Sequence, residues 1–339
     1  MAKIGDYPKV STLAKSNIML LDRADGTKGI FAGDLAKSLL SLMTTNEIMS
    51  GVNIGDLEKT TGWGLDAYNN YLIIGAADGY KKMSLSDAAF GLLDLVIDAP
   101  TRNSIVRGKN LGSEVSATQY DNIANGTFRG MFLGDFWKIG NTVWRLVDFD
   151  YWYGRGSAVC GTHHVVIMPD RGWYSEGMGG IAGDDDMGIT YGAYAKSYMY
   201  KEGLNEAKKR INNIFTEAHV LNHREFLQNA TTNGYASGGA WFDSTVEIPN
   251  EPMIFGSYIF TPANNGSTSV SRTTISHTSL ALLRLCPQLI PSYGDTYWLR
   301  DVVSKDHYAC VDRSGCPSFA SPIVQNVVRP VFGICKANS

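Results

Sequence analysis

The strongest constraint on the fold is an internal repeat in the first hundred residues. Residues 16–21 correspond to residues 69–74, a spacing of 53 positions. In both copies a short apolar run is followed by an Asp-Gly pair, at Asp25-Gly26 and at Asp78-Gly79. Asp-Gly between apolar runs is a strong signal for a β-hairpin. The repeat therefore predicts two similar hairpins near the start of the chain.

Each predicted hairpin continues into a predicted helix. The second strands are expected at 29–31 and 82–85, and Asp34 and Asp87 can cap the leucine-rich helices of about three turns that follow. The chain thus begins with two β-turn-β-α units, 1–53 and 54–98. Neither unit can bury much core alone, so they favour an attachment and oligomerisation module. A small autonomous domain with a duplicated unit is the alternative.

The segment 99–125 is expected to connect these units to a larger domain. It contains Pro100, small polar residues and the basic positions Arg102, Arg107 and Lys109. We place the boundary at 112–126, where the sequence becomes aromatic and rich in glycine. Residues 126–339 then form the second predicted domain.

Bulk composition narrows the function classes. The 339 residues carry a net charge of −3, which argues against a dedicated nucleic-acid-binding protein. No apolar run is long enough to cross a bilayer, and the N-terminus lacks the apolar core of a signal peptide. Synthesis in a cytoplasm is expected. None of the five cysteines forms a C-x-x-C pair, so free thiols are the default expectation.

The region after residue 126 predicts a mixed α+β domain. A hairpin is expected around Gly140-Asn141, and a strand at 163–169 ends at a proline. Helical spacing of apolar residues predicts a helix over 204–214, with shorter helices at 223–230 and 279–285. Strands return at 297–304 and 327–334. The stretch 305–319 between them shows no periodicity and mixes aromatic, charged and small residues, as a binding loop does.

Two motifs near the C-terminus resemble a known family. Tyr-Trp-Leu-Arg-Asp at 297–301 and Val-Arg-Pro-Val-Phe at 328–332 look like the end of C-type-lectin-like proteins that retroelements diversify in phages and bacteria. That family includes the phage major tropism determinants. Residues 126–152, with the Thr-His-His at 162–164, resemble the start of the same domain in phage fibre proteins, and the β-turn-β-α units resemble the virion-proximal parts of such fibres.

The resemblance implies a function as well as a fold. It implies a C-type-lectin-like domain over 126–339 in a homotrimeric fibre on the phage particle. The N-terminal units would contact other virion proteins, and the C-terminal domain would bind a host cell-surface glycan or protein. The chain would be a non-enzymatic virion protein without a cofactor, bound to no nucleic acid and inserted in no membrane.

In that family the binding face is the segment between the two motifs, and it varies through mutated adenines in Asn-type codons. Lys305 and Gln325 do not arise that way and are excluded. Trp298, Arg300 and Arg329 are expected to be framework residues, with Trp298 and Arg300 on one face of their strand and Leu299 on the other. The candidate binding residues are Asp306, His307, Tyr308, Cys310, Asp312, Arg313, Ser314, Cys316, Ser318, Phe319, Ser321 and Asn326.

Three further constellations keep other functions open. His219 and His223, four residues apart, could share a helix face and bind a metal with Glu225 or with His163-His164. Asp184, Asp185 and Asp186 could bind calcium in a glycine-rich loop. Cys310 and Cys316 are close enough in sequence to suggest a copper oxidase. The alternatives to a receptor-binding fibre are thus a copper- or zinc-dependent enzyme on the same fold and a purely structural capsid decoration.

Overall fold

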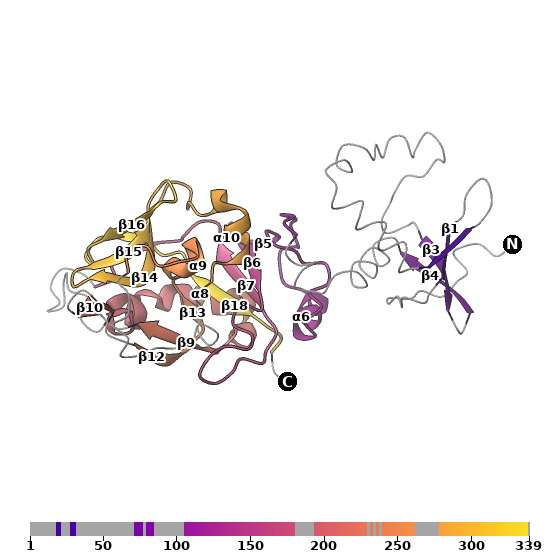
Figure 1. Ribbon diagram of the computed structural model, residues 1–339, viewed down its shortest axis with the longest axis horizontal. Helices are drawn as coiled ribbons and strands as arrows, with labels where there is room; N and C mark the ends of the chain where they lie inside the picture. The colour runs from indigo at the N-terminus through magenta and orange to yellow at the C-terminus, as the bar shows by residue number, and fades with distance from the viewer. Residues whose placement is uncertain are drawn as a thin grey trace. The chain divides into compact units, whose positions relative to one another are not determined.

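The chain is a mixed α+β protein with many strands and few helices (Figure 1). It divides into two compact units, Met1–Arg102 and Asn103–Ser339. The computed structural model describes residues 18–21, 28–31, 71–76, 79–84, 105–179, 193–228, 231–232, 235–236, 239–261 and 278–337.

The first unit contains one four-stranded antiparallel sheet. Its strands are β1 (Ile18–Leu21), β2 (Lys28–Phe31), β3 (Tyr71–Ala76) and β4 (Gly79–Ser84), in the order β2-β1-β3-β4. Both predicted hairpins are confirmed, and β1 pairs with β3, so the two repeats share one sheet. The helices expected after Asp34 and Asp87 lie outside the described residues.

The second unit begins before the expected boundary. Within the segment assigned as a connector, α6 (Ala117–Ala124) starts at a capping box in which Ser116 and Gln119 each bond the other's backbone. Ile123 of this helix is fully buried in the core of the second unit. The expected boundary at 112–126 therefore falls inside a unit that starts at Asn103.

One sheet of the second unit is antiparallel throughout, with the order β13-β18-β7-β6-β5. The predicted hairpin at Gly140-Asn141 is confirmed, since Ile139 pairs with Thr142 across it. The strands are β5 (Phe136–Ile139), β6 (Thr142–Phe149), β7 (Val165–Pro169), β13 (Val246–Glu247) and β18 (Val331–Ile334).

A first core surrounds this sheet. Trp144 makes edge contacts with Phe215 and Phe332, with ring centroids 5.1 and 5.7 Å apart. Phe215 ends α8 (Asn205–Phe215), whose buried residues Ala207, Ile211 and Phe215 are spaced four apart, as the helical pattern predicts. The expected helix near 279–285 is α10 (Ala281–Leu285), which also buries leucines here.

The second sheet has the order β16-β15-β14-β17-β8. Its central strand β14 has Tyr297 and Leu299 in the first core and Trp298 and Val302 in a second core. Because successive side chains of a strand point to opposite faces, β14 lies between two cores. The strands are β8 (Ser175–Glu176), β14 (Tyr297–Ser304), β15 (His307–Val311), β16 (Pro317–Ala320) and β17 (Asn326–Val327).

The prediction of a helix at 223–230 is wrong. This segment forms β9 (His223–Gln228), which pairs with β12 (Gly239–Ser244) and places Phe226 opposite Trp241. A short apolar run fits both the helical and the strand periodicity, and here pairing with the distant strand β12 makes it a strand.

None of the helices in the described part of the chain combines the length and the apolar character that crossing a bilayer requires. The remaining elements are α7 (Ala193–Lys196), η2 (Met199–Gly203), η3 (Glu217–His219), β10 (Thr231–Thr232), β11 (Tyr235–Ala236), α9 (Glu251–Phe255) and η4 (Pro287–Leu289).

Candidate functional site

The stretch expected to be an irregular loop, 305–319, is a hairpin formed by β15 and β16. Its tip is an ordered turn. The Asp312 carboxylate Oδ1 accepts hydrogen bonds from the backbone N–H groups of Ser314 and Cys316, at 2.8 and 2.9 Å. The Asp312 N–H in turn donates to the Cys316 carbonyl at 2.9 Å. Asp312 thus shapes the tip through its own side chain.

Burial divides the candidate binding residues into three groups. Three of them are buried and offer little surface to a ligand: Tyr308, Cys310 and Asn326. Asp306, His307, Asp312, Ser318 and Ser321 are half-buried, and Arg313, Ser314, Cys316 and Phe319 are exposed. The structure thus brings most of the predicted residues onto one hairpin but removes three from its surface.

Tyr308 and Cys310 are buried because β15 lies between two cores. In β15, Ala309 and Val311 belong to the first core, whereas Tyr308 and Cys310 belong to the second. A strand buried on both faces loses the apolar-polar alternation by which strands are recognised. The absence of periodicity over 305–319 therefore reflected double burial at β15 and not an irregular backbone.

An exposed aromatic cluster forms beside β16. The ring of Phe319 is 48% exposed and lies 5.2 Å from Phe260 and 5.3 Å from His307. Phe260 and Ile259, which are also exposed, come from the segment after α9. Exposed apolar side chains grouped in this way are typical of contact surfaces.

The segment that supplies Phe260 is held by a buried carboxylate. Glu251 accepts hydrogen bonds from the N–H groups of Ile259, Phe260 and Thr261, at 3.0, 3.1 and 3.2 Å. Sequence reasoning missed Phe260 and Ile259, because they lie about fifty residues before the hairpin and no local pattern links the two segments. The contact between Phe260 and Phe319 is a product of the tertiary fold.

A small polar cluster lies at the start of the hairpin. The Asp306 carboxylate accepts hydrogen bonds from the Ser304 hydroxyl at 2.7 Å and from His307 Nδ1 at 2.9 Å. These two bonds stabilise the charged form and lower the pKa of Asp306. Asp306 is therefore an anion at neutral pH beside the aromatic cluster.

The three residues expected to be framework are all buried. Trp298 donates its indole N–H to the Glu176 carbonyl at 2.7 Å. Arg329 donates to the carbonyls of Pro169, Ile290 and Leu289, at 3.0, 2.7 and 3.2 Å. These bonds join β14 to β8, and the segment before β18 to the end of β7 and to η4 and the residue after it.

Arg300 is part of a buried ion pair. Its guanidinium donates to Glu225 Oε1 at 2.8 Å, and the Trp152 indole donates to Glu225 Oε2 at 2.8 Å. Burial alone would raise the pKa of Glu225, but Arg300 and the hydrogen bonds from His223 and Trp152 outweigh it and lower the pKa to about 2. At the neighbouring Asp301, burial and the charge of Glu251 outweigh the Glu251 N–H and Arg300, and raise the pKa to about 7. The pair joins β14 to β9 inside the second unit.

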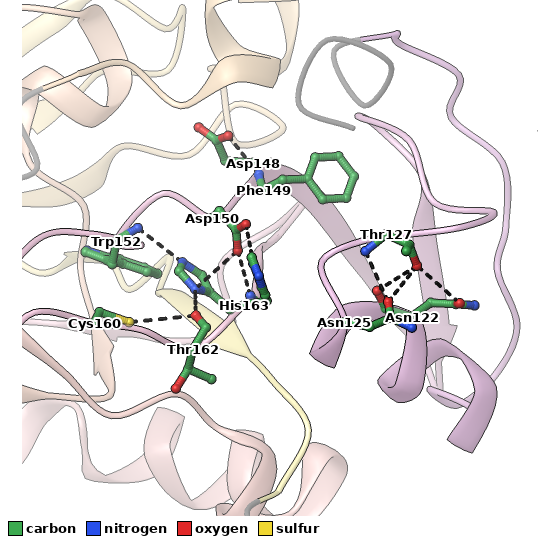
Figure 2. Close-up of polar contacts among 11 residues, drawn as sticks. Asn122, Asn125, Thr127, Asp148, Phe149, Asp150, Trp152, Cys160, Thr162 and His163 are labelled. Carbon is green, nitrogen blue, oxygen red and sulfur yellow. Dashed lines mark hydrogen bonds and ion pairs between the residues drawn. The ribbon is translucent and has the colours of Figure 1, made fainter. Parts of the chain in front are cut away.

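The histidines proposed as metal ligands are used elsewhere. His164 is buried; its Nδ1 lies 2.9 Å from the Thr162 carbonyl, and its Nε2 accepts the backbone N–H of Trp152 at 3.1 Å. Both ring nitrogens are therefore occupied, and burial lowers the pKa of His164 to about 3, so the ring is neutral. His163 bonds Asp150 at 2.7 Å, and Asp150 also accepts the His164 N–H (Figure 2). This corner of the fold is a structural hydrogen-bond cluster.

The expected helix face carrying His219 and His223 does not exist, because His219 ends η3 and His223 begins β9. His219 stacks on Tyr120 with ring centroids 3.7 Å apart. Within the described ranges, no group of three His, Cys, Asp or Glu side chains is placed to hold a metal ion. Asp184, Asp185 and Asp186 lie outside the described residues.

The two cysteines proposed for a copper site differ in environment. Cys310 is buried, and burial raises its pKa to about 11, so it is a neutral thiol at physiological pH. Cys316 is exposed at the hairpin tip. Copper coordination by sulfur requires the thiolate, which burial of Cys310 disfavours.

Comparison of the chain with protein-family models, with curated proteins and with solved structures found no match. We use the name outer face for the exposed and half-buried residues Asp306, His307, Arg313, Ser314 and Phe319 together with Ile259 and Phe260.

Proposed function

We propose that this chain is a receptor-binding fibre protein of a phage particle and that the outer face contacts a host cell-surface molecule. The observation that carries the proposal is the aromatic cluster in which Phe319 of the edge strand β16 contacts His307 of β15 and Phe260 of the segment after α9. The strands β15 and β14, which follow β16 in the sheet, are buried in two cores, so the exposed Phe319 stands on a rigid support. Binding residues on a rigid scaffold are a common arrangement in recognition domains.

The chemistry of the outer face suits a mixed polar and apolar ligand. Phe319 and Phe260 supply apolar area at little entropic cost, since an aromatic side chain has two rotatable bonds. Arg313 at the tip and the Asp306 carboxylate offer charges of opposite sign for hydrogen bonds. We infer that the receptor is a glycan or protein at the cell surface.

Two observations support the wider proposal of a fibre. The motifs at 297–301 and 328–332 resemble those of retroelement-diversified C-type-lectin-like proteins, which favours that fold for the second unit. The two repeats share one sheet, so the N-terminal unit is a compact element separate from the outer face. We propose that it attaches the chain to other virion proteins and joins three copies into a fibre.

The test is adsorption of purified protein to host cells. A triple variant, Arg313→Ser, Ser314→Ala and Phe319→Ser, changes exposed residues only. We expect its binding to fall at least about tenfold, the equivalent of roughly 1.4 kcal/mol, because aromatic and Arg side chains dominate interface energetics. Its melting temperature should remain close to that of the parent protein.

The matched control is Lys209→Ser with Tyr153→Ser, an exposed cation and an exposed aromatic on α8 and on the loop after β6. This control should adsorb normally. Normal adsorption of the triple variant would overturn the outer face as the binding surface. A larger exchange of 306–326 must keep Tyr308, Cys310 and Asn326, because they are buried.

The fibre assignment has its own test. Phage particles grown without this chain should assemble but fail to adsorb to the host. Particles that adsorb at the parental rate would instead indicate a structural decoration protein.

A further inference from the structure

A groove of about 400 Å³ lies outside the outer face. It is formed where four segments meet: the β5–β6 turn with Asn141 and Thr142, the loop after β7 with Arg171 and Trp173, helix α8 with Arg210, and the turn before β14 with Tyr293. The volume is within the range of small-molecule sites. No residue of the outer face lines it.

Two arginines in this groove are stacked on two aromatic rings. The Arg171 guanidinium lies 5.5 Å from the centre of the Tyr293 ring, and the Arg210 guanidinium lies 5.7 Å from that of Trp173. Stacking orients the planar guanidinium while leaving its N–H groups available at the edge. Such a group binds a carboxylate through two parallel hydrogen bonds.

The backbone at Tyr293 is held in an unfavourable conformation. Tyr293 and Gly294 both have positive φ, at 48° and 87°, and Ser292 pairs with Asp295 across them. This is the geometry of a two-residue type I′ turn, in which Asn-Gly is the preferred pair. A bulky residue at the first position is strained, yet its ring is 69% exposed and gains little from packing. Strain of this kind points to a functional reason for the side chain.

The charges in the groove leave its arginines accessible. Asp170 is engaged by Arg145 through both carboxylate oxygens, so its charge is balanced. Arg171 lies 3.9 Å from Asp295, and both side chains are exposed, which makes this a weak pair. Arg210 pairs with Glu206 on the surface of α8. An anionic ligand can displace such exposed pairs at little cost.

Neutral hydrogen-bonding groups complete the lining. Asn141 and Thr142 offer amide and hydroxyl groups at the end of the hairpin. The indole N–H of Trp173 is buried and has no hydrogen-bond partner in the described part of the chain. A buried donor without a partner is destabilising.

We propose that this groove binds an acidic saccharide. Arg171 and Arg210 bind its carboxylate, the exposed ring of Tyr293 packs against the apolar face of the sugar, and Asn141 and Thr142 bond its hydroxyls. The site uses residues other than those of the outer face, so the two proposals stand or fail separately.

The test measures binding of D-glucuronate to the full chain by saturation-transfer NMR. D-glucose and acetate serve as comparison ligands. We expect saturable binding of glucuronate at least about tenfold tighter than that of either comparison ligand. Equal binding of glucose would overturn the role of the carboxylate. Equal binding of acetate would indicate an adventitious anion site only, and no saturable binding of glucuronate would overturn the proposal outright.

Two variants locate the site. Tyr293→Asn places the preferred residue in the type I′ turn, so it removes the ring while the turn stays intact. Arg171→Gln removes one cation. Each should weaken glucuronate binding about tenfold, whereas Tyr153→Asn and the outer-face triple variant should bind it normally. Parental affinity in both groove variants would place glucuronate elsewhere and overturn the proposal.

Discussion

Strands β15 and β16 are neighbours in one hairpin, yet they bury very different amounts of surface. Four of the five residues of β15 are buried, whereas no residue of β16 is. The hairpin thus combines a strand that is fixed by packing with a strand that is free to vary. A region of about fifteen residues can therefore hold both the support of a binding surface and the surface itself.

This difference follows from position in the sheet. β15 lies between β14 and β16 and contributes to two cores, and β16 is the edge strand. An edge strand with an exposed phenylalanine is an association hazard unless a partner covers it. The presence of Phe319 at this edge is the reason to look for such a partner.

The largest effect predicted from the comparison of β15 with β16 is that of Tyr308→Ala in β15. Tyr308 is 2% exposed, and truncation of a buried aromatic residue costs about 3–5 kcal/mol. We expect a loss of this size in chemical denaturation. Alkylation of the adjacent buried thiol Cys310 should accelerate in the variant, since local opening of β15 exposes it. A loss below about 1 kcal/mol would mean that β15 is not the support that its burial indicates.

The substitution Arg300→Leu tests the second buried strand of the support, β14. Removal of the cation leaves Glu225 charged and buried, which costs about 3–5 kcal/mol in other proteins. We expect a loss of stability at the lower limit of this range, about 3 kcal/mol. A cavity of about 10 Å³ beside Arg300 has room for about one water molecule, which would solvate the remaining charge of Glu225.

The double variant Arg300→Leu with Glu225→Gln is the matched control. It removes both charges and should recover part of the lost stability. A double variant no more stable than Arg300→Leu alone would show that packing, and not the ion pair, is the function of Arg300.

The parts of the fold that could be predicted carry their signal locally. The Asp-Gly pairs at 25–26 and 78–79 predict the two hairpins from the sequence, and α8 displays its buried face as residues spaced four apart. The expected strand 297–304 coincides with β14. In each case neighbouring residues contain the information.

The parts that could not be predicted depend on distant partners. β9 is a strand because β12 pairs with it, and β15 lacks alternation because two cores cover it. Sequence reasoning assigned Arg313, Ser314 and Phe319 to the surface, where the structure places them. It missed Phe260, whose contact with Phe319 depends on the folded chain. Whether these residues bind a receptor remains a prediction.

A smaller effect is expected at the hairpin tip, from Gly315→Ala. Gly315 has φ of +87°, and a Cβ built on it would lie 2.8 Å from the Pro291 ring. The backbone conformation alone costs a residue with a Cβ about 1–2 kcal/mol. We expect a loss of that size in thermal unfolding, with the turn displaced from Pro291.

The control at the tip is Ser314→Ala. Ser314 is exposed and contributes to the turn through its backbone N–H, which the substitution retains. This variant should unfold like the parent protein. Equal stability of Gly315→Ala and Ser314→Ala would show that the tip is more adaptable than its hydrogen bonds indicate.

The smallest effect on stability is expected from Phe319→Ser in β16. The ring is half exposed, and among the described residues its ring contacts are with Phe260 and His307, so the change should stay within about 0.5 kcal/mol. The same substitution should weaken adsorption to host cells, because it removes the central ring of the outer face. Denaturation and adsorption measured on one preparation separate the two roles. A stability loss as large as that of Tyr308→Ala would make Phe319 a core residue and would erase the distinction between the two strands.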